Sequence, residues 1–253
     1  MSGYFAFTKK ELTENIRNYR LLIMLALFFF FGVLSPLSAK FTPQIIEAFT
    51  INMEISFEEP TALDAWTQFY KNVSQLGLSL TVILFSSCLS NEYTKGTLTI
   101  MLTKGLSRRA VILSKFTAAT VIMTVSYWLS YGVTYGYTAY LWTGAELSHV
   151  FFAAFALWVV ALLYLCILML GCVLFRQAFT SILFFLAITV VMSLLGMTPL
   201  FGTFSPIFLT SKNVDLLSGA VSISQFTAPA ITSIIMSIGM LVLAVAAFNK
   251  KQL

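Results

Sequence analysis

The chain has 253 residues, of which 58% are hydrophobic and only 10% are charged. Soluble domains carry about 25% charged residues, so this composition excludes a soluble globular protein. The net charge of +5 does not indicate nucleic-acid binding, because the basic residues are divided among several loops. The apolar residues gather in runs of about 20, the length that crosses a bilayer. The sequence therefore predicts an all-α membrane protein with a single transmembrane domain over 1–253.

Six apolar runs are predicted to cross the membrane, and an amphipathic segment over 1–20 precedes them. In that segment Phe5, Leu12, Ile16 and Tyr19 form one stripe, which is typical of a helix lying in the membrane interface. A cleavable signal peptide is the alternative for the first run, but the charged leader is long and more spans follow. The predicted spans cover residues 21–39, 72–90, 116–142, 150–175, 178–195 and 227–248.

Three connections between spans are more than short turns. Residues 40–71 are acidic and too long for a plain loop, so short helices are expected within this extracytoplasmic segment. Residues 91–115 are the most charged run between two long apolar segments. Residues 196–226 are apolar but interrupted by glycine and proline, which indicates broken or re-entrant helices before the sixth span.

The distribution of basic residues predicts the orientation. Six spans place both termini on one side, and twelve Lys and Arg residues fall on that side while three fall on the other. The positive-inside rule therefore places both termini and residues 91–115 in the cytoplasm, and residues 40–71 outside. The twelve are Lys9, Lys10, Arg17, Arg20, Lys95, Lys104, Arg108, Arg109, Lys115, Arg176, Lys250 and Lys251, and the three are Lys40, Lys71 and Lys212.

A short helix is predicted within residues 91–115. Thr97 is a good N-cap, and Gly105 stands where a left-handed C-cap residue is expected. Leu98, Met101 and Leu102 share one face because they are spaced i, i+3 and i+4. So short a helix must dock on something to be stable. Its own leader helix is one candidate, but a partner protein is preferred, because a charged loop has little else to bury against.

A longer helix is predicted to follow, capped by Ser107. Arg108 and Arg109 open that helix at its positive dipole end, where cations are unfavourable. A compensating interaction is therefore expected, and the anionic lipid phosphates of the cytoplasmic membrane face would supply it.

Polar residues inside the spans are candidates for a translocation pathway. Gln75, Ser79 and Ser86 fall on one face of the second span. An amide exposed to lipid would lack hydrogen bonds, so this face must meet protein, water or substrate. Contacts between packed helices are the alternative to a pathway.

Several chemistries are excluded or disfavoured by what the sequence lacks. The predicted span interiors hold no Asp, Glu, Lys, Arg or His, which argues against an ion-coupled carrier. No G-x-x-x-x-G-K-[ST] motif exists, so ATP is not bound in that way, and energy for transport would come from another chain. The three cysteines, Cys88, Cys166 and Cys172, fall in apolar runs and predict neither a disulfide nor a metal site.

Residues 92–115 read E-Y-T-K-G-T-L-T-I-M-L-T-K-G-L-S-R-R-A-V-I-L-S-K. This run resembles the cytoplasmic segment of ABC-2-type permeases, the membrane subunits of one class of ABC exporters. The motif is degenerate, but the basic leader, the six spans and the broken segment extend the resemblance over the whole chain. The matching positions are Glu92, Gly96-Thr97-Leu98, Ser107-Arg108 and Lys115.

The resemblance implies a dimer of permeases with two cytoplasmic ATPase subunits, one bound to each permease. The ATPase subunits would bind ATP and magnesium. This chain itself would bind no cofactor, metal or nucleic acid. The helix over 98–104 is similar to a coupling helix that inserts into the ATPase, and the leader is similar to an elbow helix. Spans one, two and five would lie near the dimer cavity, which adds Thr189 and Ser193 to the pathway candidates. The implied coupling residues are Glu92, Gly96, Thr97, Leu98, Met101, Leu102, Lys104, Ser107 and Arg108.

The expected function is export of a hydrophobic or amphipathic molecule across the cell membrane, with a peptide preferred over a lipid or a drug. The second permease copy would be identical or a close paralogue. Two alternatives belong to other classes. One is a membrane enzyme acting on lipid, and the other is a non-transporting scaffold or immunity protein.

Overall fold

The computed structural model describes residues 2–49, 59–103, 105–145, 147–198 and 201–251. Within these ranges every regular element is a helix, and six helices are long and apolar enough to cross a membrane. The predicted all-α fold with six spans is thereby confirmed. Five spans are single helices: α2 (Arg20–Phe49), α7 (Arg108–Leu141), α8 (Val150–Leu174), α9 (Ala178–Gly196) and α12 (Ile223–Lys250). The second span consists of four successive elements: α3 (Ala62–Asn72), the π-helical turn η1 (Val73–Gly77), α4 (Leu78–Ser86) and α5 (Ser90–Lys95).

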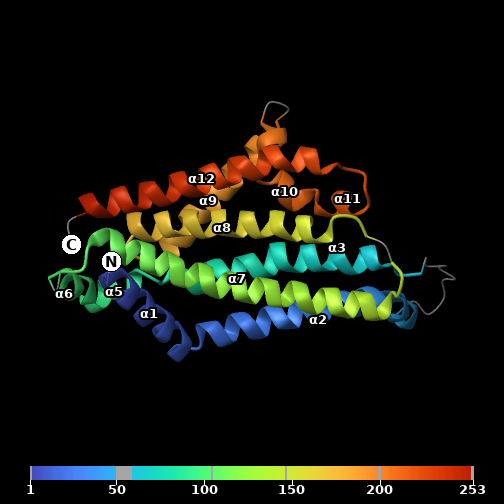
Figure 1. Cartoon of the computed structure of the whole chain (residues 1–253), viewed down its shortest axis with the longest axis horizontal. Coiled ribbons are helices and arrows are strands. Elements are labelled where there is room, and N and C mark those ends of the chain that lie inside the picture. The colour runs from blue at the N-terminus through green and yellow to red at the C-terminus, as the bar shows by residue number, and fades with distance from the viewer. Residues whose placement is uncertain (1, 50–58, 104, 146, 199–200, 252–253) are drawn as a thin grey trace.

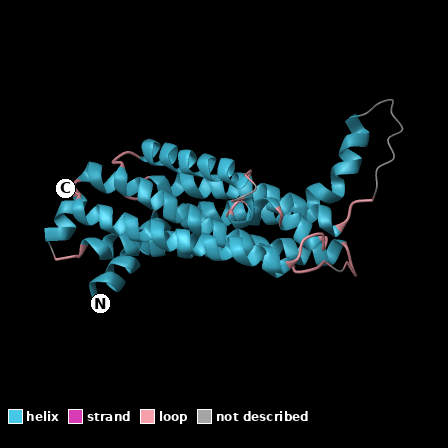
Figure 2. Ribbon diagram, turned by 90° about the horizontal axis from the view of Figure 1, so that it is seen from above, coloured by secondary structure: helices cyan, strands magenta, loops and turns pink. Residues whose placement is uncertain are grey.

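Short helices fill the remaining described segments. The leader forms α1 (Ser2–Arg17), and α6 (Thr97–Thr103) lies between the second and third spans. The predicted broken segment contains the 3-10 turn η2 (Gly202–Phe204), α10 (Phe208–Ser211) and α11 (Asn213–Leu217). Figure 1 shows both termini at one end of an elongated bundle, beside α1, α5 and α6, and this end is called the termini end below. The rest of the bundle is helical throughout its length (Figure 2).

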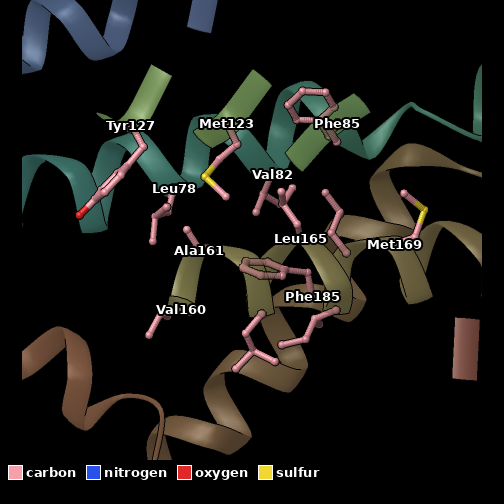
Figure 3. Packing of buried hydrophobic residues seen from close by; sticks show 14 of the residues in the cluster. Leu78, Val82, Phe85, Met123, Tyr127, Val160, Ala161, Leu165, Met169 and Phe185 are labelled. Carbon is pink, nitrogen blue, oxygen red and sulfur yellow. The ribbon is translucent and has the colours of Figure 1, made fainter. Parts of the chain in front are cut away.

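Helix α8 is the centre of the bundle. It is apolar on all sides, as expected for a helix that is buried over most of its surface. Of its most apolar window 78% lies buried, against 17% for α9 and for α12. Side chains from α4, α7 and α9 surround it, among them Val82, Met123 and Phe185 (Figure 3). The outer faces of α9 and α12 are therefore free for lipid or for a second protein.

Close packing of α2 on α7 depends on a glycine. A Cβ atom on Gly32 would lie 2.8 Å from the carbonyl oxygen of Ser130, which no real contact permits. The hydroxyl of Thr134 donates to the carbonyl oxygen of Gly32 at 3.1 Å. Small residues and interhelical hydrogen bonds hold membrane helices together, because burying apolar surface gives little gain when lipid is the alternative.

Helices extend into the predicted external segment 40–71 from both sides. Helix α2 continues to Phe49, and α3 begins at Ala62, within the segment where short helices were expected. Helix α3 is amphipathic: Trp66 and Phe69 are buried in the bundle while Asp64 and Lys71 are exposed, so its composition did not mark it as part of a span. Residues 50–58 lie outside the described part of the chain. The third long helix likewise begins at Arg108, before the predicted span at 116.

Candidate functional site at the termini end

The chain between the second and third spans folds as a tight hairpin of short helices. Gly96 ends α5 in the left-handed conformation with φ 65°, and α6 begins directly after it. Thr97 is thus the first residue of α6 and not the predicted cap before it. Gly105 has φ 89° and donates its N–H to the carbonyl oxygen of Leu102 at 3.0 Å, which confirms the predicted C-cap. Lys104 lies outside the described residues.

The apolar face of α6 points into this protein. Leu98 is only 2% exposed, and Met101 and Leu102 pack partly buried against the same core. Leu98 is therefore not available to a partner, while contact of Met101 and Leu102 with a partner stays a prediction. A two-turn helix gains stability only by docking, and the bundle itself supplies the surface. The outward face of α6 carries Thr99 and Ile100 instead, and Ile100 is 55% exposed.

Arg108 connects the start of α7 with the end of α12. Ser107 caps α7 as predicted, because its hydroxyl accepts from the N–H of Ala110 at 3.3 Å. The guanidinium of Arg108 turns away from the positive end of its own helix and donates to carbonyl groups at the negative end of α12. The compensation expected from lipid phosphates thus comes, for Arg108, from protein. The acceptors are the carbonyl oxygens of Phe248 at 3.0 Å, Asn249 at 3.2 Å and Lys251 at 2.5 Å.

Lys251 extends this connection from α12 to α8. Its ammonium donates to the carbonyl oxygens of Val173 at 2.6 Å and Leu174 at 3.1 Å, at the C-terminus of α8. The same ammonium lies 5.0 Å from the ring centre of Tyr93 on α5, a favourable cation–π distance. The ends of α5, α7, α8 and α12 are thereby held together by side chains far apart in the sequence.

A buried ion cluster joins α1, α5 and α7. Lys115 donates to both carboxylate oxygens of Glu11, at 3.1 and 3.0 Å. It also forms an ion pair with Glu92 Oε1 at 2.8 Å. Glu11, Glu92 and Lys115 are each 5–6% exposed. Charges this buried persist only when paired, so the three side chains fix one another's positions.

Lys10 extends the cluster to the surface of α1. Its ammonium lies 2.5 Å from Glu14 Oε2 and 3.6 Å from Glu92 Oε1. Burial would lower the pKa of Lys10, but the carboxylates of Glu14 and Glu11 outweigh it and raise that pKa. Burial would likewise raise the pKa of Glu14, but Lys10 outweighs it and lowers that pKa. Both groups stay charged near neutral pH.

Helix α1 lies against α7 with one face and leaves the other outward. Tyr4 and Thr117 share a hydrogen bond of 2.8 Å between their hydroxyls, and Thr8 donates to the Ser114 hydroxyl at 3.0 Å. The predicted apolar stripe faces outward, with Phe5 67% exposed. This arrangement suits a helix that presents one side to lipid and the other to the bundle.

Sequence reasoning missed Glu11 and Lys251 as members of this site. For Glu11 a signal existed, because Phe7, Glu11 and Asn15 are spaced i, i+4 and i+8 and form the buried face opposite the apolar stripe. For Lys251, next to the end of the last span, the sequence offered only a topological role. Glu92 and Lys115 were identified from the resemblance alone.

The structure does not bring the pathway candidates of the second span together. Gln75 and Ser79 face outward from the bundle, whereas Ser86 is 3% exposed. The thiol of Cys172 on α8 donates to the carbonyl oxygen of Ser86 at 3.1 Å, so α8 covers the end of α4. The three residues predicted to share one polar face therefore lie in two environments. The helix itself was predicted, but the packing of α8 over Ser86 was not.

The two candidates on α9 lie on a helix that is mostly outward-facing. Thr189 and Ser193 are both half-buried. The hydroxyl of Thr189 donates to carbonyl oxygens of its own helix, those of Phe185 at 3.0 Å and Leu186 at 2.9 Å. Their place in a pathway stays a prediction.

An all-helical bundle with six spans and a braced helical hairpin between the second and third spans defines a multi-pass membrane protein. The chain belongs to the ABC-2 transporter family, because the family model described as ABC-2 family transporter protein matches residues 5–253. It is also similar to the uncharacterized transmembrane protein YxlG of Bacillus subtilis, with 26% identity over 167 residues. That match covers 63% of this chain and 64% of YxlG, less than two thirds of the length of either. The resemblance drawn from residues 92–115 is thereby confirmed at the level of the family.

Proposed function

We propose that this chain is the permease subunit of an ATP-driven ABC exporter, with a separate ATPase bound at the termini end. The observation that supports this most is the hairpin of α5, α6 and the start of α7. Its inner face is packed on the bundle through Leu98, while its outer face presents the apolar side chain of Ile100. A short helix docked firmly on the bundle can transmit force to it, and Ile100 with the hollow beside it is the part of α6 left open to a partner.

The contacts of the hairpin would transmit a displacement of α6 to the rest of the bundle. Glu92 on α5 is paired with Lys115 on α7, which is paired in turn with Glu11 on α1. Arg108 binds the end of α12, and Lys251 binds the end of α8. A displacement of α6 would therefore move several spans together, because breaking buried ion pairs and hydrogen bonds at helix ends costs several kcal/mol of free energy, about 3–5 kcal/mol for a buried pair.

A hollow beside α6 offers room for a partner's side chain. It has a volume of about 300 Å³ and lies between the α5–α6 turn and the α8–α9 turn. Its lining includes Glu92, Leu98 and Arg176. Ile100 and this hollow together form the contact surface that we assign to the ATPase, in place of the buried Leu98.

The remaining parts of the proposal follow the family. Two permease copies, identical or paralogous, would each hold one ATPase, in which ATP and magnesium are bound. Both termini would face the cytoplasm of the cell membrane, since most basic residues lie at that end. The outward-facing Gln75 and Ser79 and the half-buried Thr189 and Ser193 would meet the second copy or a shared cavity. The substrate would be hydrophobic or amphipathic, with a peptide preferred, because the predicted span interiors carry no charge.

Affinity purification tests the proposal. A tagged chain, extracted from its own cells in mild detergent, is expected to carry an ATP-hydrolysing subunit, detected by mass spectrometry and phosphate release. Ile100→Asp should release that subunit, while Tyr140→Asp, at an exposed position of the opposite end, should retain it. The wild-type chain purifying without any ATPase would favour the alternatives, a scaffold or a lipid-modifying enzyme.

A further inference from the structure

A second hollow lies at the end of the bundle opposite the termini. It has a volume of about 450 Å³ and is enclosed by the start of α3, the end of α7 and the turn into α8. This is within the range of small-molecule sites in proteins. Aromatic rings supply much of its lining, those of Trp66, Tyr135 and Trp142, together with the apolar side chain of Leu147.

The aromatic lining is held in place before any ligand arrives. The indole N–H of Trp142 donates to the carbonyl oxygen of Pro60 at 2.6 Å, which ties the end of α7 to the segment before α3. Trp66 packs on Tyr131 with ring centres 5.5 Å apart, and Tyr131 stacks on Tyr135 at 6.2 Å. A preformed lining loses little conformational freedom on binding.

One polar group in this hollow has no partner. Thr138 lines it and is only 6% exposed, yet its hydroxyl has no hydrogen-bond partner among the described residues. By contrast, the hydroxyl of Thr134 one turn earlier donates to the carbonyl oxygen of Gly32. Buried hydroxyls are normally paired, so an unpaired one inside a hollow points to a ligand that donates or accepts there.

The charge around the hollow selects the sign of that ligand. No Lys, Arg, Asp or Glu occurs among its described lining residues. The carboxylate of Glu59 belongs to the residue directly before the Pro60 that Trp142 binds. Aromatic faces attract cations, and a nearby carboxylate favours a cation as well.

We propose that this hollow is a binding site for an amphipathic amine. The protonated nitrogen donates an N–H to the hydroxyl oxygen of Thr138 and lies against the rings of Tyr135 and Trp142. The apolar part of the ligand packs on Leu147. This site goes beyond the proposed function, because binding there requires neither ATP nor an ATPase subunit.

Three probes of one shape test the proposal on the purified chain in lipid nanodiscs without ATPase. Phenethylammonium is the cation, 2-phenylethanol the neutral analogue and 3-phenylpropanoate the anion, and binding is measured by ligand-observed NMR against empty nanodiscs. The cation should bind saturably and about tenfold more tightly than either analogue. Thr138→Val, which keeps the shape, should weaken it about tenfold, since a hydrogen bond to a charged group is lost. Thr143→Val, in the exposed turn, should leave it unchanged.

Tyr135→Leu provides a second variant that does not depend on the hydroxyl. Tyr135 is 56% exposed, so this change should leave the melting temperature unchanged while weakening the cation several-fold. Equal binding of the three probes would overturn the proposal, because an apolar hollow without selectivity gives that result. Undiminished binding of phenethylammonium to Thr138→Val would overturn it as well.

Discussion

Lys115 is the residue on which the termini end depends most. It lies buried between Glu11 and Glu92, which come from helices far from each other in the sequence. A buried ion pair adds little net stability compared with a well-packed apolar replacement of the whole set. Removing one member is different, because it leaves the remaining charges buried without a partner.

Lys115→Met therefore should destabilise the protein by about 3–5 kcal/mol, the usual cost of breaking a buried pair. Thermal unfolding in detergent measures the loss. Lys95→Met on the exposed side of α5 is the matched control and should be near neutral. The triple variant Lys115→Met with Glu11→Gln and Glu92→Gln should recover much of the loss. A Lys115→Met protein as stable as the control would show that the cluster does not hold α1 on the bundle.

The residue scale also shows how far sequence reasoning reaches. The caps at Ser107 and Gly105 were predictable, because capping depends on residues a few positions apart. The pairing of Lys115 with Glu11 and of Arg108 with Phe248 was not, because the partners lie 104 and 140 positions apart in the sequence. Pairing at such separations is set by tertiary packing alone.

The second span contains a π-helical turn, η1, between α3 and α4. A π-helical turn holds one residue more than an α-helix needs. It lets α3 bury Trp66 and Phe69 while α4 buries Val82 and Phe85. The sequence predicted a span from 72 with short helices before it, because α3 is too amphipathic to be read as part of a span and no residue pattern marks the turn.

Deleting Ser74 from this turn should convert it to plain α-helix and leave both flanking registers intact. The folded yield in membranes, measured by size-exclusion chromatography, should stay close to that of the wild type. Deleting Val125, an outward residue in the uninterrupted α7, is the control. It should abolish folding, since it rotates one half of α7 by about 100° against the other. If both deletions fail alike, the extra residue of η1 is required and this account of the span is wrong.

At the scale of the whole molecule, the number of spans could be predicted, because runs of about 20 apolar residues dominate the composition. The central position of α8 was not predicted, although its apolar residues on every side were a signal. The face of α6 was assigned to a partner because a loop was assumed to have no core to dock on. The bundle provides that core.

Topology is the first test at this scale. In a variant whose three native cysteines are replaced by serine, a single cysteine at Thr143 should react with an impermeant maleimide in intact cells. A single cysteine at Thr103 should react only after the cells are opened. Both positions are exposed, so access depends on sidedness alone. Labelling of the Thr103 position in intact cells, with Thr143 protected, would reverse the orientation.

The central claim is that an ATPase binds the outward face of α6, and site-specific crosslinking tests it most directly. A photo-crosslinking amino acid is placed at Ile100 in one strain and at Tyr140, also exposed, in another. After illumination of living cells, the protein carrying the crosslinker at Ile100 should form an adduct that mass spectrometry identifies as an ATP-binding subunit. The protein carrying it at Tyr140 should form none with that subunit. Adducts from Ile100 with lipid or with this chain only, and none with an ATPase, would contradict the account.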